Sequence, residues 1–348
     1  MRQLQRLLQW QHWPFFIFHT PLVFAWLRNY LRSRSLWYFT AANPKLTFGG
    51  FEGESKSEQY ALLPPHLYPR TVIVNPGENI EDVKERIAAA ALEYPFVVKP
   101  DVGMKGILFR KIYQSGQLEA YHRQMPATYL VQEFVQLPLE VSVFYCRMPD
   151  AEKGVITAFI QKDLLQVKGD GRSTLSQLVR RDPEANCFYP EASRQLGKQM
   201  EQVLPEGKPF VLSHVANLMN GARFINLRHL IDERLCGVFD AISHQCHFYY
   251  GRYDIKCTAP TDLHTGKGFH ILEFNGAGSV PNHIYTGTYT LLQAYAEIIK
   301  HWNWLFAISD AHRKKGFRYP GTVEGQMFLQ GSKKHFNRLK ALDRELVL

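Results

Sequence analysis

The amino-acid sequence predicts a protein of the α+β class, in which antiparallel strands form sheets and helices lie beside them. Runs rich in β-branched and aromatic residues follow one another, as in FVVKP (96–100) and TYLVQEFV (128–135). The short segment DVGMKG separates the first run from ILFRKI (107–112), a pattern typical of a hairpin with a Gly-rich tip. Apolar residues at helical spacing occur elsewhere in the chain, which adds helices to the sheets.

Composition limits the partners that the protein can bind. The 348 residues are 45% hydrophobic, which is enough for a sizeable core and for two or three lobes. The net charge of +9 favours anionic partners such as nucleotide phosphates or anionic lipid. We expect no nucleic-acid partner, because the chain has no zinc-finger spacing and no RNA-binding signature. Five scattered cysteines without a CxxC pair indicate reduced thiols and a cytoplasmic protein.

The N-terminal segment is aromatic and basic. Its apolar run at 13–27 is interrupted by HTP at 19–21, and a membrane-spanning helix needs about 20 apolar residues. A signal peptide also fits poorly, because prolines and a histidine break the apolar region. Two alternatives remain open. The segment either packs on the protein as a hairpin or lies in the membrane interface, where residues 1–36 would contact an anionic surface on the inner face.

The other elements follow a boundary rich in Gly, Pro and Ser that ends near residue 55. TVIV (71–74) predicts a strand, and 78–94 predicts a helix because its apolar residues recur at i, i+3, i+7 and i+11. Ser173 or Thr174 can cap the helix that follows them. Further strands are predicted at 139–148, 154–167 and in the runs RYDIKC and ILEFN. Further helices are predicted at 175–183, 191–203, 230–246 and 288–316. A short basic helix is predicted near the C-terminus.

A lysine ends the strand FVVKP, and a Gly-containing turn follows it. Gly103 and Gly106 would let backbone N–H groups approach an anion, while Lys99 and Lys105 would add positive charge. This combination is typical of a phosphate-binding loop, although the P-loop pattern GxxxxGK[ST] is absent. A plain hairpin turn is the alternative interpretation.

A second candidate site lies in the stretch GRYDIKC…ILEFN. Glu273 and Asn275 are two residues apart on one strand and therefore project from the same face, as do Arg252 and Asp254 on the other. Two carboxylates and an amide suit Mg²⁺ that is held mainly through nucleotide phosphates and water. Cross-strand charge pairing on a solvated face would produce the same pattern.

The order of the motifs LEYPFVVKP…GMKG, LVQEFV…LEVSVFY and GRYDIKC…ILEFNGAGS resembles the ATP-grasp superfamily, in particular its D-alanine–D-alanine ligase-like and cyanophycin-synthetase-like members. The resemblance implies an ATP-grasp fold, in which two α+β lobes with antiparallel sheets sandwich ATP. Since only 54 residues precede this region, the resemblance implies a truncated form of the domain that comes before the fold in the family. The implied division is an N-terminal segment at 1–54, an ATP-grasp domain at 55–316 with a small lobe at about 97–136 and a catalytic lobe at about 137–316, and a basic tail at 317–348.

The resemblance also implies roles for single residues. The expected nucleotide-binding residues are Lys99, Gly103, Lys105, Gly106, the hinge residues Glu133, Phe134 and Val135, and the ribose-binding Glu140. The expected catalytic residues are Arg252, Lys162 and Gly278, with Lys168 as the second candidate for the γ-phosphate lysine. The segment HVANLMNGARF resembles the family's acyl-site segment, which suggests His214, Asn217 and Arg223 as substrate residues. The expected Mg²⁺ ligands are Asp254, Glu273 and Asn275. The same ligands would also suit Mn²⁺.

The implied function is that of an ADP-forming ligase. ATP would activate a small carboxylate as an acyl phosphate, which an amine or a similar nucleophile would then capture. Two other interpretations stay open. The acceptor could be a hydroxyl or a sugar phosphate, or the protein could bind nucleotide without catalysing a reaction. A homo-oligomer is compatible with each of them.

Overall fold

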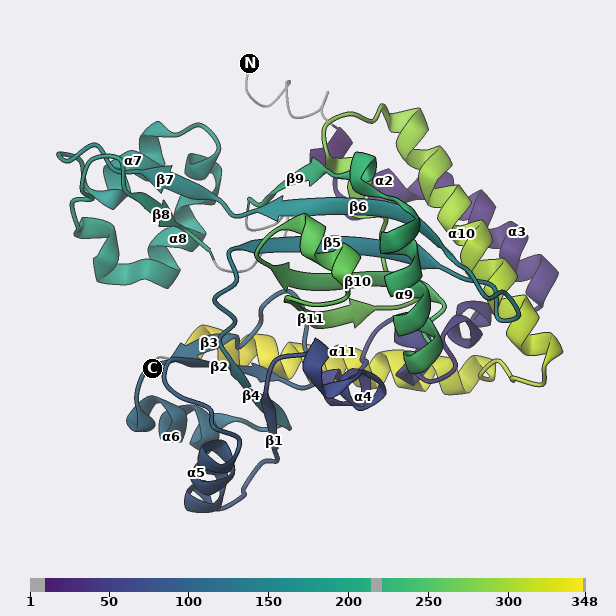
Figure 1. Cartoon of the computed structure of the whole chain (residues 1–348), viewed down its shortest axis with the longest axis horizontal. Helices are drawn as coiled ribbons and strands as arrows, with labels where there is room; N and C mark the ends of the chain where they lie inside the picture. The colour runs from purple at the N-terminus through teal and green to yellow at the C-terminus, as the bar shows by residue number, and fades with distance from the viewer. Residues whose placement is uncertain (1–9, 214–220, 347–348) are drawn as a thin grey trace.

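Two antiparallel sheets organise the structure, a computed structural model that describes residues 10–213 and 221–346 (Figure 1). The strand order is β1-β4-β2-β3 in the small sheet and β11-β10-β5-β6-β9 in the large sheet. Every neighbouring pair is antiparallel, which confirms the predicted α+β class. The strands are β1 (Thr71–Val74), β2 (Phe96–Pro100), β3 (Arg110–Ile112), β4 (Tyr129–Glu133), β5 (Leu139–Cys146), β6 (Val155–Asp163), β9 (Arg223–Asn226), β10 (Tyr250–Cys257) and β11 (Phe269–Asn275).

Helices cover both faces of the large sheet (Figure 1). Alternate residues of β5 point to opposite faces, as the period of a strand requires. Val143 and Tyr145 pack in one core cluster with α9 (Glu233–Cys246), whereas Phe144 packs in another with α10 (Leu291–Lys314). The large sheet is therefore buried on both sides. The small sheet is packed against α5 (Ile80–Ala89) and α6 (Ser115–Gln124).

A third, smaller lobe extends from the end of β6 (Figure 1). It contains α7 (Leu175–Arg181), α8 (Tyr189–Leu196) and a two-stranded sheet of β7 (Gln166–Lys168) and β8 (Pro209–Val211). The predicted cap of α7 is confirmed, because the Thr174 side chain accepts a hydrogen bond from the backbone N–H of Gln177 in a capping box. The strand predicted at 154–167 is divided, so β6 and β7 belong to different sheets.

The N-terminal segment packs on α10 through α2 (Phe15–His19) and α3 (Val23–Ser33). Phe18 and Leu22 are buried in a cluster that includes Ile298 of α10. The ring centroids of Trp26 and Trp302 lie 5.3 Å apart. Within the described part of the chain, no helix is both long and apolar enough to span a membrane.

The C-terminal helix is much longer than predicted. Instead of a short basic helix, α11 (Thr322–Glu345) has 24 residues and crosses to the small lobe, where Leu339 is fully buried. The Phe328 ring stacks on Phe48, with centroids 4.3 Å apart. The length of the helix was underestimated because its apolar residues are scattered among many basic ones.

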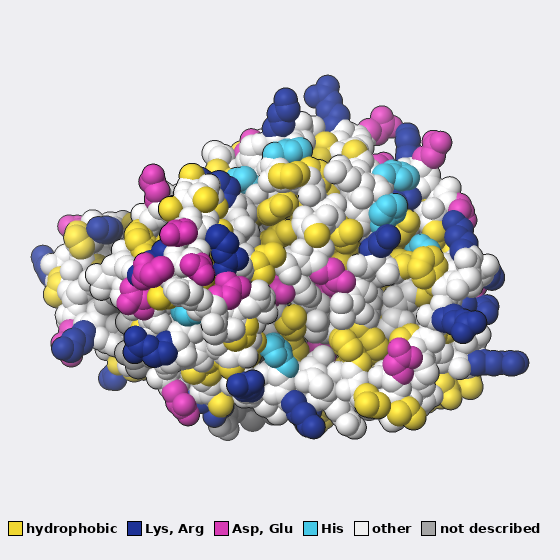
Figure 2. All heavy atoms as spheres, turned by 90° about the horizontal axis from the view of Figure 1, so that it is seen from below, with side chains coloured by type: hydrophobic (Ala, Val, Ile, Leu, Met, Phe, Trp, Pro, Cys, Tyr) yellow, Lys and Arg dark blue, Asp and Glu magenta, His cyan; other side chains and the backbone are white. Residues whose placement is uncertain are grey.

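Acidic side chains cluster on the surface of the small lobe (Figure 2). In this lobe, α5 carries the exposed residues Glu81 and Asp82.

Asn43 ties the N-terminal segment to the large sheet. Its fully buried amide accepts hydrogen bonds from the backbone N–H groups of Tyr249 (2.9 Å) and Tyr250 (3.1 Å). It also donates to the carbonyls of Tyr250 (2.8 Å) and Gly49 (3.2 Å). Gly49 in turn accepts from the N–H of Ala277, so Asn43 fixes the loop that packs against the end of β11.

Replacing Asn43 with Ala should lower the free energy of unfolding by about 2–4 kcal/mol, because several buried backbone groups would lose their partners. Urea unfolding followed by far-UV circular dichroism measures the change. Asn79→Ala is the control, since this exposed N-cap of α5 should cost only about 1 kcal/mol. Equal losses in the two variants would contradict this role of Asn43.

Candidate active site

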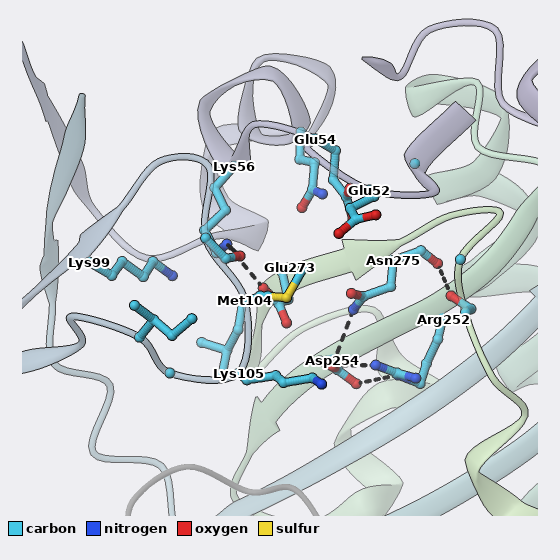
Figure 3. A pocket seen from close by; sticks show the side chains of 18 of the residues that line it. Glu52, Glu54, Lys56, Lys99, Met104, Lys105, Arg252, Asp254, Glu273 and Asn275 are labelled. Atoms are coloured by element: carbon cyan, nitrogen blue, oxygen red, sulfur yellow. Dashed lines mark hydrogen bonds and ion pairs between the residues drawn. The ribbon is translucent and has the colours of Figure 1, made fainter. Parts of the chain in front are cut away.

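A cavity of about 540 Å³ lies where residues of the two sheets face each other (Figure 3). The small lobe contributes Lys99 and the loop after β2, and the large sheet contributes residues of β5, β6, β10 and β11. The sheets thus bring together segments that are far apart in the sequence. The predicted residues that line the cavity are Lys99, Gly103, Lys105, Gly106, Glu140, Lys162, Arg252, Asp254, Glu273, Asn275 and Gly278.

Asp254 is the centre of the charged network in this cavity. In the β10–β11 register it lies opposite Glu273, and Arg252 lies opposite Asn275. Its Oδ1 atom is 3.0 Å from Lys162 Nζ and 3.0 Å from Arg252 Nε. The Asn275 amide donates to the Oδ2 atom at 3.4 Å. Burial alone would raise the pKa of Asp254, but Arg252 and Lys162 outweigh burial and lower it, so this carboxylate is ionised.

Lys162 joins two strands of the large sheet by bridging two carboxylates. Its ammonium is 3.0 Å from Asp254 Oδ1 and 3.0 Å from Glu140 Oε1, and its side chain is only 5% exposed. Glu140 lies directly opposite Lys162 in the β5–β6 register. Burial would lower the pKa of Lys162, but the two carboxylates outweigh burial and raise it. A buried cation is therefore held firmly at the cavity wall.

Lys56 belongs to the same site, although it was not predicted as a site residue. It begins α4 (Lys56–Leu62), and its Nζ lies 3.5 Å from Glu273 Oε2 and donates to the carbonyl of Gly103 at 3.0 Å. Burial would raise the pKa of Glu273, but the lysine charges, Lys56 first, outweigh burial and lower it. A capping signal was present in the sequence, because Ser55 and Glu58 are spaced as in S-x-x-E.

Lys99 differs from the other cavity lysines. Its Nζ is 3.3 Å from the hydroxyl of Tyr60, and among the described residues no carboxylate oxygen lies within 4 Å of it. Burial therefore lowers the pKa of Lys99 to about 8. A buried ammonium that has no carboxylate partner can pair with an anionic ligand, because binding the anion would offset the cost of burial.

The loop after β2 closes one side of the cavity, and α11 holds it from outside. The backbone N–H of Leu108 donates to Asp343 Oδ1 at 2.9 Å, and His335 Nε2 lies 2.8 Å from the carbonyl of Val102. Lys105 adopts the left-handed conformation (φ 55°), and Gly106 follows it at φ 77°. This turn presents Lys105 to the cavity. None of these contacts from the C-terminal helix was predicted.

The cavity has a balanced charge. The basic residues that line it are Lys56, Lys99, Lys105, Lys162 and Arg252, and the acidic ones are Glu52, Glu54, Glu140, Asp254 and Glu273. Burial raises the pKa of Glu54, one of two carboxylates that were not predicted. Since the lining charges cancel, a polyanionic ligand would need additional positive charge from a metal ion.

Asp254, Glu273 and Asn275 fit Mg²⁺ by the chemistry of their atoms, since all three offer hard oxygen ligands from adjacent strands. In residues 10–213 and 221–346, no three His, Cys, Asp or Glu side chains group as a metal site by themselves. A metal ion here would therefore take further oxygen ligands from phosphates and water.

The predicted hinge lies between the two sheets but outside the cavity wall. Glu133 ends β4, and Phe134 and Val135 begin the link to β5. The Glu133 carboxylate is 3.0 Å from Arg70 Nε, and this hydrogen bond lowers its pKa. Lys111 Nζ lies 3.8 Å from the centre of the Phe134 ring. The position joins the lobes as a hinge must, while the Glu133 side chain is paired elsewhere.

Two other predicted residues do not reach the cavity. Lys168 is exposed on β7 in the third lobe. Arg223 is exposed and forms an ion pair with Glu184, because alternate residues of β9 face opposite ways and Phe224 is the one that lines the cavity. His214 and Asn217 lie outside the described residues.

Comparisons with known proteins find weak similarity to solved structures. No protein-family model matches the chain, and no curated protein matches its sequence. The ATP-grasp ligase PsnB complexed with minimal precursor is 17% identical with a TM-score of 0.39, over 71% of this chain and 60% of that chain. The VanG D-Ala:D-Ser ligase from Enterococcus faecalis is 13% identical with a TM-score of 0.41, over 71% of this chain and 61% of that chain.

A third solved structure is the D-alanine–D-alanine ligase from Bacillus anthracis, at 13% identity and a TM-score of 0.41, over 75% of this chain and 69% of that chain. The chain thus spans about three fifths of the length of PsnB and VanG. In all three cases the identity is 17% or lower and the TM-score is below 0.5.

The lowered pKa of Lys99 predicts how stability changes with pH. Between about pH 8 and the ordinary lysine value of 10.5, the folded protein has released a proton that the unfolded chain keeps. Stability should therefore be reduced below pH 8 and should recover as the pH rises through this window. Lys99→Met should stabilise the protein at pH 7 by about 1–3 kcal/mol, less than full burial implies because the cavity is open to water.

Urea unfolding at pH 7 and pH 9.5 tests this prediction, and the stabilising effect should shrink at the higher pH. Lys45→Met, at an exposed lysine, is the control and should show no such pH dependence. A Lys99→Met variant that is less stable than the unmodified protein at pH 7 would contradict the conclusion that Lys99 is buried without a carboxylate partner.

Proposed function

We propose that the protein is an ATP-grasp ligase that depends on Mg²⁺, activates a carboxylate as an acyl phosphate and joins it to an amine or a similar nucleophile. One observation carries the proposal. Five cationic side chains from both lobes surround two carboxylates on the paired strands β10 and β11, at the wall of a single cavity. This arrangement suits a triphosphate with a bound metal ion, since phosphoryl transfer needs positioning and charge neutralisation above all.

The lysines would hold the phosphate groups of ATP. Lys99 has no carboxylate partner among the described residues and can pair with the α- and β-phosphates, as the resemblance implies. Lys105 and the N–H groups of its turn would cover the phosphates from the other side. Lys162 is fixed by Asp254 and Glu140 and would present a stable positive charge near the γ-phosphate. Asp254, Glu273 and Asn275 would hold Mg²⁺, which neutralises phosphate charge when bound, and Mn²⁺ suits the same ligands.

The reaction would proceed in two steps. A carboxylate oxygen of the substrate attacks the γ-phosphorus, the bond to the leaving oxygen of ADP breaks, and an acyl phosphate forms. The nitrogen of a neutral amine then attacks the acyl carbon, loses a proton, and inorganic phosphate leaves. Arg252 would stabilise the negative charge that develops on the acyl oxygen, because its guanidinium is held at the cavity wall by Asp254 and by the carbonyl of Val280, to which it donates at 3.4 Å.

The acidic wall of the cavity favours an amine as the acceptor. Glu52 and Glu54 line the cavity beside Lys56 (Figure 3). Carboxylates at this position attract a substrate that carries an ammonium group and repel one that carries a phosphate. The amine acceptor is therefore preferred over a sugar phosphate.

Asp254→Asn and Glu273→Gln should each reduce ADP formation by about 100-fold or more, because each removes a carboxylate that would hold the metal ion. The measurement is ADP release in the presence of Mg²⁺, with mixtures of small carboxylic acids and amines as substrates. Glu191→Gln, which removes an exposed carboxylate paired with Arg194 on the third lobe, is the control and should keep full activity. Unchanged ADP release in both cavity variants would contradict the metal assignment.

The C-terminal helix should affect nucleotide binding through the loop that it holds. Asp343→Ala removes the acceptor for the Leu108 N–H and the ion-pair partner of Arg110, so the loop should close less often. We expect the KM for ATP to rise by about 3- to 10-fold, with a smaller change in kcat. Glu345→Ala, at an exposed residue of the same helix, should leave both constants unchanged. The opposite pattern, a fall in kcat at constant KM, would contradict this role.

A further inference from the structure

The N-terminal helices carry a row of exposed apolar side chains. Large parts of Phe16 (70%), Phe24 (78%) and Leu31 (64%) are exposed to solvent. Val23 and Leu27 are also exposed, at 58% and 45%. Single exposed apolar residues are common, but a contiguous row of large ones indicates an interaction surface.

Helix α3 is apolar on two opposite sides. Its inner side packs on the protein, where Trp26 contacts Trp302 and Asn29 is fully buried. On the outer side, Phe24, Leu27 and Leu31 fall within about 60° of one another at 3.6 residues per turn. A surface helix normally presents polar residues on its outer side. Contacts within residues 10–213 and 221–346 therefore do not account for this row.

Basic residues flank the apolar row. Arg28 and Arg32 follow the outer side of α3 and, together with Lys314 of α10, line a groove of about 460 Å³. The Arg32 guanidinium lies 4.2 Å from the centre of the Phe306 ring, which also lines the groove. One acidic residue, Asp310, is present in the groove and is paired with Lys314 at 2.9 Å. Arg28 and Arg32 therefore place positive charge beside the apolar row.

We propose that the outer face of α2 and α3 binds an anionic membrane surface. The apolar row would enter the boundary between headgroups and acyl chains, and the flanking arginines would contact lipid phosphates. Contact with a second copy of the chain is disfavoured, because a two-fold interface centred on α3 would bring Arg28 and Arg32 of both copies together. The acidic surface of the small lobe in Figure 2 lies on a different part of the molecule from α3 (Figure 1).

Vesicle sedimentation with the full chain tests this proposal. The protein should bind vesicles that contain phosphatidylglycerol, bind vesicles of phosphatidylcholine alone more weakly, and lose affinity as the salt concentration rises. The double variant Phe24→Gln/Leu31→Gln should lower the partition coefficient by about ten-fold or more. Arg28→Gln/Arg32→Gln should remove the preference for anionic vesicles and leave the weaker binding.

The control is Ile73→Gln/Val203→Gln, which replaces two exposed apolar residues in the small and third lobes and should leave vesicle binding unchanged. Far-UV circular dichroism and thermal unfolding confirm that each variant is folded. Three outcomes would overturn the proposal. In the first, the unmodified chain does not bind anionic vesicles. In the second, the control variant loses as much vesicle binding as Phe24→Gln/Leu31→Gln. In the third, the unmodified chain does not bind vesicles but dimerises with rising concentration, and Phe24→Gln/Leu31→Gln abolishes the dimer.

Discussion

The ion-pair network of Asp254 with Lys162 and Arg252 is the interaction on which the candidate site depends. A buried carboxylate with two cations at 3.0 Å is stable only while all three groups remain, since removing one leaves an uncompensated buried charge. The network spans β6 and β10, and the β10–β11 register places Glu273 opposite Asp254. The pairing of the large sheet therefore decides which charges meet in the cavity. If the pairing register of β10 shifted by one residue, these side chains would point to the opposite face of the sheet.

The rest of the structure completes the cavity around this network. The small lobe brings Lys99 and the Gly-rich loop to the site, and α11 holds the loop through Asp343. The segment fixed by Asn43 packs its backbone against the residues after β11, where Gly278 donates to the carbonyl of Gly50 at 3.1 Å. The loop fixed by Asn43 and the C-terminal helix α11 thus both contribute to the walls of the cavity. Such a site depends on contacts that are distant in sequence more than on any single motif.

The sequence was sufficient to predict the strands of the two sheets and the charged residues at the centre of the cavity. Strands such as β5 alternate between two buried faces, and β2 carries near its end the lysine that lines the cavity, so local sequence patterns were enough to predict these features. Lys56, Glu52 and Glu54 were not predicted, because their approach depends on how the N-terminal loop folds back. Arg223 was assigned to the substrate site, but the alternation of β9 turns it away and places Phe224 inside. The length of α11 was missed because few apolar residues mark its buried side.

The central claim is that this cavity binds ATP together with Mg²⁺, and calorimetric titration tests it most directly. ATP titrated into the full chain in the presence of Mg²⁺ should bind one site per chain, and binding should weaken strongly when EDTA removes the metal. The metal dependence follows from the cancelled charge of the cavity, which leaves the metal ion to neutralise the phosphates. Absence of ATP binding with Mg²⁺ present, or equal binding with and without it, would contradict the account.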